Sequence, residues 1–196
     1  MSIASLIVLI AATGIIRPGD HVVLVGDSEA YLLAHEFPAL AARDGVRFTA
    51  HPRPGSSVIT WASASAWAST RADHPNVLLI SLGANDACMG AGVVANEGPH
   101  LTRLLAHAAN TGAREIVWLG PPSIGSATIL PQASAGLSAF ATMIRATSTR
   151  YLDARTIAIS MWPDLLHCSR PQFYGDNKAN GCSTWARWVW DDLSRT

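Results

Sequence analysis

A serine near the start of the chain and an acid–histidine pair near its end are the residues best suited to chemistry. Ser28 ends a Gly26-Asp27-Ser28 turn after an apolar run. A serine hydroxyl there is exposed beside a helix N-terminus, which favours developing negative charge. Asp164 precedes His167 by three residues, so its carboxylate can fold back onto the ring Nδ1–H and leave Nε2 free to accept a proton. These residue types together predict nucleophilic acyl transfer with Ser28 as the nucleophile.

Each of these parts also has a purely structural interpretation. Asp27 and Ser28 are of types that commonly cap helices, and taken alone the capping interpretation is favoured. The spacing of Asp164 and His167 can arise by coincidence in a chain with seven histidines. His51, which follows a second apolar run, is the one serious alternative base. Ser28, Asp164 and His167 therefore favour catalysis only when they are considered together.

Two further turns carry groups that can hold an oxyanion. Asn85 lies in Gly83-Ala84-Asn85-Asp86, where its side-chain amide can donate to a negatively charged oxygen. Gly55 lies in a Pro-Gly-Ser-Ser turn, where its backbone N–H is a second candidate donor. Both segments are also ordinary turn sequences. With the N–H of Ser28 they form a candidate oxyanion hole.

Short apolar runs alternate with amphipathic stretches along the chain. The runs predict strands over residues 21–25, 46–50, 77–82, 115–119 and 156–160, and the stretches predict helices over 29–44, 57–72, 98–111 and 132–151, with a last helix around 185–189. This alternation indicates an α/β fold, a three-layer α/β/α sandwich with a five-stranded, flavodoxin-like parallel sheet. Ligands bind such sheets beyond the carboxyl ends of the strands. The candidate site residues all follow predicted strands.

In this order the segments resemble the sequence blocks of SGNH hydrolases, the GDSL-like esterases and lipases. The resemblance spans residues 21–190: Ser28 matches the nucleophile block, Asn85 the third block, and Asp164 with His167 the final block, while Gly55 is a looser match. It implies the SGNH fold and a serine carboxylic ester hydrolase that needs no metal or organic cofactor.

The sequence departs from this family's pattern in two places. Glu29 follows the nucleophile where many relatives have leucine or another aliphatic residue, and the loop over 169–180 is enlarged. Sliding the last block to Asp176 leaves no histidine after it, so Asp164 and His167 are kept.

Composition limits the partners that we expect. The 196 residues favour one domain over 1–196. The 14 basic and 14 acidic residues balance, which argues against a nucleic-acid partner. The three cysteines are too few for a disulfide scaffold and wrongly spaced for zinc. Cys168 and Cys182 flank the enlarged loop and are expected to form a disulfide in an oxidising compartment, leaving Cys88 as a free thiol.

The apolar stretch over residues 1–16 leaves two interpretations open. It is short for a membrane span, so no stable membrane insertion is expected. It resembles the centre of a signal peptide but lacks a basic start, and it is equally consistent with a segment packed on the domain. An extracytoplasmic or secreted location is slightly favoured.

The substrate is the least determined feature. No amphipathic lid of a long-chain lipase is apparent, so a short acyl group, such as acetyl, on a carbohydrate or cell-wall polymer is favoured. Trp61, Trp67 and Trp162 are candidates for stacking on sugars. The resemblance also allows lipase, lysophospholipase or thioesterase activity. A non-catalytic carbohydrate-binding or structural domain of this fold is a further alternative, whereas a nucleotide-binding domain is disfavoured because no phosphate-cradling glycine loop follows the first strand.

Overall fold

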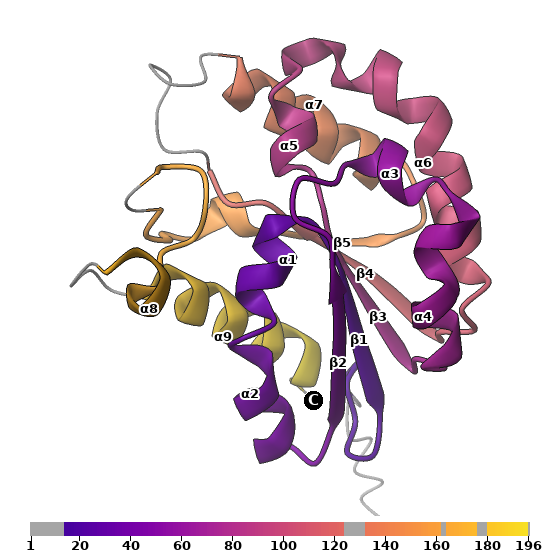
Figure 1. Cartoon of the computed structure of the whole chain (residues 1–196), viewed down its shortest axis with the longest axis vertical. Helices are drawn as coiled ribbons and strands as arrows, with labels where there is room; N and C mark the ends of the chain where they lie inside the picture. The colour runs from indigo at the N-terminus through magenta and orange to yellow at the C-terminus, as the bar shows by residue number, and fades with distance from the viewer. Residues whose placement is uncertain (1–13, 124–131, 162–163, 176–179, 196) are drawn as a thin grey trace, which may run out of the picture.

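A parallel sheet forms the centre of the molecule. The computed structural model describes residues 14–123, 132–161, 164–175 and 180–195. Within them the strands are β1 (His21–Gly26), β2 (Arg47–Pro52), β3 (Val77–Ser81), β4 (Glu115–Gly120) and β5 (Arg150–Asp153). They pair in the order β2-β1-β3-β4-β5, and every pair is parallel (Figure 1). The predicted α/β fold with a five-stranded parallel sheet is confirmed.

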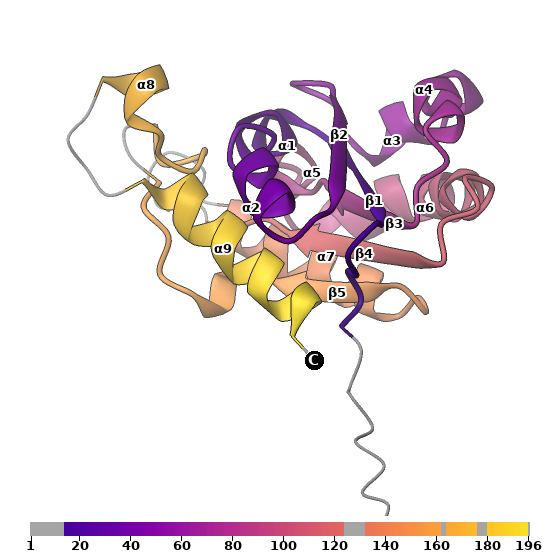
Figure 2. The same ribbon diagram turned by 90° about the horizontal axis from the view of Figure 1, so that it is seen from below.

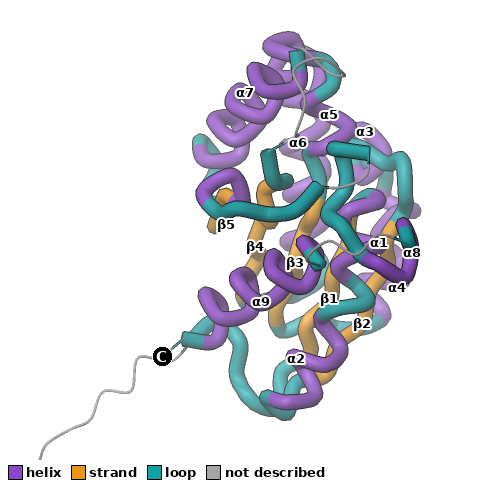
Figure 3. The backbone as a smooth tube through the Cα atoms, turned by 90° about the vertical axis from the view of Figure 1, so that its left-hand side faces the viewer, coloured by secondary structure: helices purple, strands orange, loops and turns teal. Residues whose placement is uncertain are grey.

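Helices cover both faces of this sheet. They are α1 (Ser28–Leu33), α2 (Phe37–Arg43), α3 (Val58–Trp61), α4 (Ala68–Ala72), α5 (Ala84–Ala87), α6 (Val93–Ala109), α7 (Ala133–Arg145), α8 (Pro171–Tyr174) and α9 (Gly181–Ser194), with 3-10 turns at Ala64–Trp67, Gly90–Gly92 and Ala154–Thr156. Figure 2 shows α1, α2 and α9 on one side of the strands and α3, α4 and α6 on the other. Figure 3 looks onto the first of these faces.

Alternating strand residues build two separate cores. In β1, Val22 and Leu24 pack with α1, α2 and α9, whereas Val23 and Val25 pack with α3, α6 and α7. All four side chains are fully buried, so the strand is apolar along its whole length, as expected for a strand covered on both faces. Burial of each such side chain stabilises the fold by about 1.5–3 kcal/mol.

The predicted position of the fifth strand is wrong. The sequence predicts this strand at residues 156–160, after a helix reaching 151, but the helix ends at Arg145 and β5 occupies Arg150–Asp153. The Thr147 hydroxyl donates to the Ile144 carbonyl and accepts from the Thr149 N–H, which offers the backbone an alternative to the helix. Asp164 and His167 therefore lie on a long connection after β5.

Two predicted helices are broken into shorter ones. The helix expected over 29–44 divides into α1 and α2, with Pro38 in the first turn of α2, because proline has no N–H for an α-helical bond back into the preceding turn. The helix expected over 57–72 consists of α3, a 3-10 turn and α4. The other predicted strands and helices are present with shifted ends, whereas the short helices α5 and α8 were not predicted.

The two ends of the described chain lie together. The Ile16 N–H donates to the Leu193 carbonyl at 3.0 Å, and Gly14 packs against the backbone of Ser194. This contact is at the edge where the strands begin, opposite their carboxyl ends (Figure 1). No helix in the described ranges is long and apolar enough to cross a membrane. Most of the apolar stretch over 1–16, together with Trp162 and Asp176, lies outside the described residues.

Candidate active site

The turn between β1 and α1 fixes the position of Ser28. Gly26 has φ 149°, and a Cβ on it would lie 1.9 Å from the Ser81 carbonyl oxygen, so the turn presses directly against β3. The Asp27 N–H donates to that same oxygen at 3.1 Å. The Asp27 carboxylate accepts from the Glu29 N–H at 2.9 Å and caps α1. Asp27 thus performs the capping, which leaves the Ser28 hydroxyl available for another partner.

That partner is His167. Ser28 Oγ and His167 Nε2 lie 2.8 Å apart, although 139 residues separate them in sequence. On the other side of the ring, His167 Nδ1 lies 2.7 Å from Asp164 Oδ2. With the proton on Nδ1 held by the carboxylate, Nε2 accepts from the serine hydroxyl. The structure therefore brings together all three residues that the sequence proposed as an acyl-transfer group.

A tight turn holds Asp164 in place. Its second oxygen, Oδ1, accepts from the N–H groups of Leu166 and His167 at 3.0 and 2.9 Å. Leu165, between Asp164 and Leu166, has φ 59°, in the left-handed region that is unusual for a residue with a side chain. Desolvation acts to raise the pKa of Asp164, but the hydrogen bonds from His167 and Leu166 outweigh it, and the pKa lies below its ordinary value. Asp164 is therefore a carboxylate at neutral pH.

The two candidate oxyanion segments converge on the same turn. Asn85 Nδ2 donates to the Ser56 carbonyl at 2.9 Å, and Ser56 Oγ donates to the Gly26 carbonyl at 3.3 Å. Gly55, beside Ser56, is exposed and has φ 78°, a backbone conformation suited to glycine. Segments following β1, β2 and β3 are thus linked at the carboxyl edge of the sheet. The alternative base, His51, instead has its Nε2 2.6 Å from Asp73 Oδ2.

Three buried carboxyl groups lie around this edge. Desolvation raises the pKa of both Asp27 and Asp86 to about 7, and it raises the pKa of Glu29 well above its usual range. Glu29 Oε2 accepts from the Cys168 N–H at 3.4 Å, which connects α1 to the residue after His167. The sequence showed Glu29 only as a departure from the family pattern. Its contact with the histidine segment could not be read from spacing.

A disulfide and an ion pair hold the segment after His167. Cys168 and Cys182 form a disulfide, as predicted, and Cys88 is a free thiol. Arg170, buried beside them, has its Nε 2.9 Å from Glu36 Oε1. These two links hold α8 next to α1.

A cavity of about 350 Å³ opens between α8 and α1. Ser28 and His167 line it together with the aromatic side chains of Tyr31, Phe173 and Tyr174. These aromatic residues carry no common signal in the sequence, because Tyr31 comes from α1 and the other two from α8, with about 140 residues between them.

The proposal that Trp61 and Trp67 stack on sugars is wrong. Both are 0% exposed and pack edge to face in the core beneath α3. The third tryptophan proposed for this role, Trp162, lies outside the described residues.

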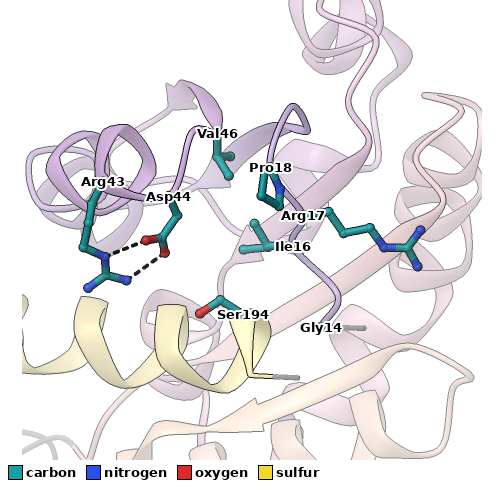
Figure 4. Close-up of a pocket in the computed structure, with 8 residues that line it drawn as sticks. All are labelled: Gly14, Ile16, Arg17, Pro18, Arg43, Asp44, Val46 and Ser194. Atoms are coloured by element: carbon teal, nitrogen blue, oxygen red, sulfur yellow. Dashed lines mark hydrogen bonds and ion pairs between the residues drawn. The ribbon is translucent and has the colours of Figure 1, made fainter. Parts of the chain in front are cut away.

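A larger cavity lies at the opposite end of the sheet. Its volume is about 670 Å³. Figure 4 shows its lining residues, which come from the start of the described chain, the end of α2 and the end of α9. Arg43 and Asp44 on its wall are paired with each other at 2.7 Å. It is remote from Ser28 because it lies where strands begin, whereas ligands of such sheets bind where strands end.

Comparison with solved structures identifies the fold. No family model matches the chain, and no curated protein matches it in sequence. An acetyl xylan esterase from Geobacillus stearothermophilus superposes with a TM-score of 0.59 at 16% identity, covering 93% of this chain and 98% of that one. A protein named as a GDSL-like lipase from Parabacteroides merdae gives 0.62 at 14% identity, with 91% and 97% covered. A family 3 carbohydrate esterase from Clostridium thermocellum gives 0.57 at 14%, with 89% and 94% covered. The chain therefore shares the SGNH hydrolase fold over nearly its full length.

Proposed function

We propose that this protein is a serine esterase in which Ser28 attacks the ester carbonyl and His167 and Asp164 move and stabilise the proton. The observation that carries this proposal is the continuous chain of short contacts from Ser28 Oγ through the His167 ring to Asp164, at 2.8 and 2.7 Å. A nucleophile, a base and a group that orients the base are the parts that acyl transfer requires.

The first half of the reaction forms an acyl-enzyme. Ser28 Oγ attacks the carbonyl carbon while its proton passes to His167 Nε2, and the carbonyl electron pair moves onto oxygen. Asp164 stabilises the resulting imidazolium. The oxyanion collapses, the bond to the alcohol oxygen breaks, and Nε2 returns the proton to the leaving alcohol. Water then repeats these steps on the acyl-enzyme and releases the carboxylic acid and free Ser28.

The oxyanion would be held by the N–H groups of Ser28 and Gly55 and by the side-chain amide of Asn85. Asn85 uses one amide hydrogen for the Ser56 carbonyl, and this bond fixes the plane of the amide while leaving the second hydrogen for the substrate. Donors fixed in advance stabilise developing charge more effectively than donors that must reorient.

The substrate that we propose carries a short acyl group, such as acetyl, on a carbohydrate or cell-wall polymer. Two of the similar structures are named as carbohydrate or xylan esterases, and the cavity beside Ser28 is open and aromatic. A lipase is the second candidate, since the Parabacteroides protein is named as GDSL-like lipase. The disulfide supports a location outside the cytoplasm, where cysteines oxidise stably.

A non-catalytic domain of this fold would be supported by a long Ser28–His167 distance. The observed 2.8 Å is instead within hydrogen-bond reach, which supports the enzyme.

Hydrolysis of p-nitrophenyl acetate and longer acyl esters, together with covalent labelling by an organophosphonate, tests this function. Ser28→Ala is expected to abolish labelling, and His167→Ala is expected to lower kcat by about three orders of magnitude or more. His51→Ala is the matched control, because His51 also contacts an aspartate but not Ser28. Labelling that persists in Ser28→Ala, or equal losses in the two histidine variants, would contradict the proposal.

A further inference from the structure

The cavity beside Ser28 has a wall that is built by α8. The Phe173 ring lies 6.0 Å from Tyr31 and 5.0 Å from His35, both in edge-to-face arrangements, so α8 continues the aromatic surface of α1. Tyr31 and Phe173 remain 40% and 41% exposed. Large apolar side chains with this much exposure at the mouth of a cavity indicate a binding surface.

Contacts with Arg170 fix the position of the Phe173 ring. The guanidinium of Arg170 stacks on it at 5.0 Å, and Arg170 itself is buried and paired with Glu36. The N–H groups of Phe173 and Tyr174 both donate to the Arg170 carbonyl. The ring is thus held in place before any ligand arrives, which lowers the entropy lost on binding.

The position of this wall relative to Ser28 and His167 indicates whether it contacts the alcohol part or the acyl part of the ester. The alcohol oxygen leaves with a proton from His167 Nε2, so the alcohol portion of the substrate must lie next to that ring. Ser28 and His167 both line the cavity, as do Leu32 and Pro54, the residue before Gly55, whereas Asn85 does not. The contact of the cavity with the His167 ring places it on the alcohol side.

The chemistry of the lining restricts the ligand. Apart from His167 and Ser28, the described lining residues are apolar or aromatic and carry no charge, so a charged alcohol would lose solvation without a partner. The hydroxyl groups of Tyr31 and Tyr174 have no hydrogen-bond partner in the described chain. Desolvation, with the charges of Asp164 and Glu29, raises the pKa of Tyr174 to about 12, so this phenol stays a neutral donor.

We infer that Tyr31, Phe173 and Tyr174 form an alcohol-side subsite for a neutral six-membered ring with an apolar face, a pyranose or a carbocycle. This inference rests on the proposed esterase function, because it assigns the part of that substrate which leaves first. The ring lies flat on Phe173 or Tyr31, and hydroxyl groups on a pyranose bond to the tyrosine hydroxyls.

Three acetates of primary alcohols with similar leaving groups test the subsite: ethyl acetate, cyclohexylmethyl acetate and methyl 6-O-acetyl-β-D-glucopyranoside. For wild type, kcat/KM for at least one ring acetate is expected to exceed that for ethyl acetate by about tenfold, or about 1.4 kcal/mol. Phe173→Ala is expected to reduce this ratio to about one, and Phe173→Tyr to preserve it. Val94→Ala is the control, since Val94 is similarly exposed but lies on α6. Preference for the sugar acetate over the cyclohexyl acetate would identify the pyranose as the ligand.

A binding measurement separates this inference from the function on which it rests. In Ser28→Ala, saturation-transfer NMR should detect cyclohexylmethanol or methyl β-D-glucopyranoside, and the signal should vanish when Phe173→Ala is added. Ring alcohols that bind in this way would uphold the subsite even if no ester were hydrolysed. Equal kcat/KM for all three acetates in an enzyme that labels at Ser28 would overturn the subsite alone. A Phe173→Ala variant that changes the preference between ethyl acetate and ethyl butyrate would overturn its assignment to the alcohol side.

Discussion

Replacing Asp27 by asparagine is expected to make the stability of the protein less sensitive to rising pH. Asp27 is 0% exposed, and desolvation, reinforced by the charge of Asp86, raises its pKa from 3.8 to about 7. The native state therefore binds this proton more tightly than the unfolded chain does. Stability falls as pH rises above about 4 and levels off above about 7, because the native state must then hold an ionised buried carboxylate.

The size of the effect follows from these two pKa values. Between pH 5 and pH 8, proton linkage gives a loss of about 2–3 kcal/mol in the free energy of unfolding. Asparagine retains an oxygen that accepts from the Glu29 N–H and so preserves the cap of α1, but it cannot ionise.

Urea unfolding at pH 5 and pH 8, followed by tryptophan fluorescence, measures this difference. The fall in the free energy of unfolding between the two pH values is expected to be about 2–3 kcal/mol smaller in Asp27→Asn than in wild type. Asp191→Asn, partly exposed on α9, removes the same charge without the same burial and is the matched control. If wild type and Asp27→Asn lost stability equally over this range, the argument from burial of Asp27 would be refuted.

Three further changes have defined outcomes. Asn85→Ala is expected to lower kcat by about a hundredfold while the protein stays folded, with a loss of about 1 kcal/mol from the missing bond to Ser56; wild-type turnover would remove Asn85 from the proposed oxyanion hole. Gly26→Ala should sharply reduce the yield of folded protein by circular dichroism, because its Cβ would overlap the Ser81 carbonyl; a native-like melt would contradict this. Cys182→Ser should lower the free energy of unfolding by about 3 kcal/mol, since the disulfide with Cys168 spans 14 residues, and an unchanged urea midpoint would argue against it.

The parts of the fold that the sequence predicted well are those encoded by continuous apolar runs. Strands β1 and β3, which precede Ser28 and Asn85, were found because each is a short apolar run buried on both faces and ended by a turn. Strand β2, which precedes Gly55, is instead an edge strand whose residues are at most partly buried. The parallel arrangement then brought their following residues to one edge without any knowledge of side-chain contacts.

The error in the fifth strand arises where hydrogen bonds from side chains compete with those of the helix backbone, because hydrophobic periodicity does not show this competition. The threonines after Arg145 end α7 through side-chain bonds to the backbone, so the fifth strand begins earlier than its apolar pattern suggested. Trp61 and Trp67 were proposed as sugar platforms but lie in the core. Helical spacing alone does not tell which face of a helix is covered.

The aromatic wall beside Ser28 was missed for a different reason. It forms only when α8 returns to α1, and that return depends on the ion pair of Arg170 with Glu36 and on the disulfide. A contact between residues so far apart in sequence leaves no local signal at either of them.

The hydrogen bond between Ile16 and Leu193 determines where the protein can be joined to a linker or a surface. Both described ends emerge at the foot of the sheet, and Ser28 lies at its head. A linker, a carrier module or a solid support joined at either described end would therefore lie at the opposite edge of the sheet from Ser28. The cavity beside Ser28 would then face away from the attachment, whichever of these ends is tethered.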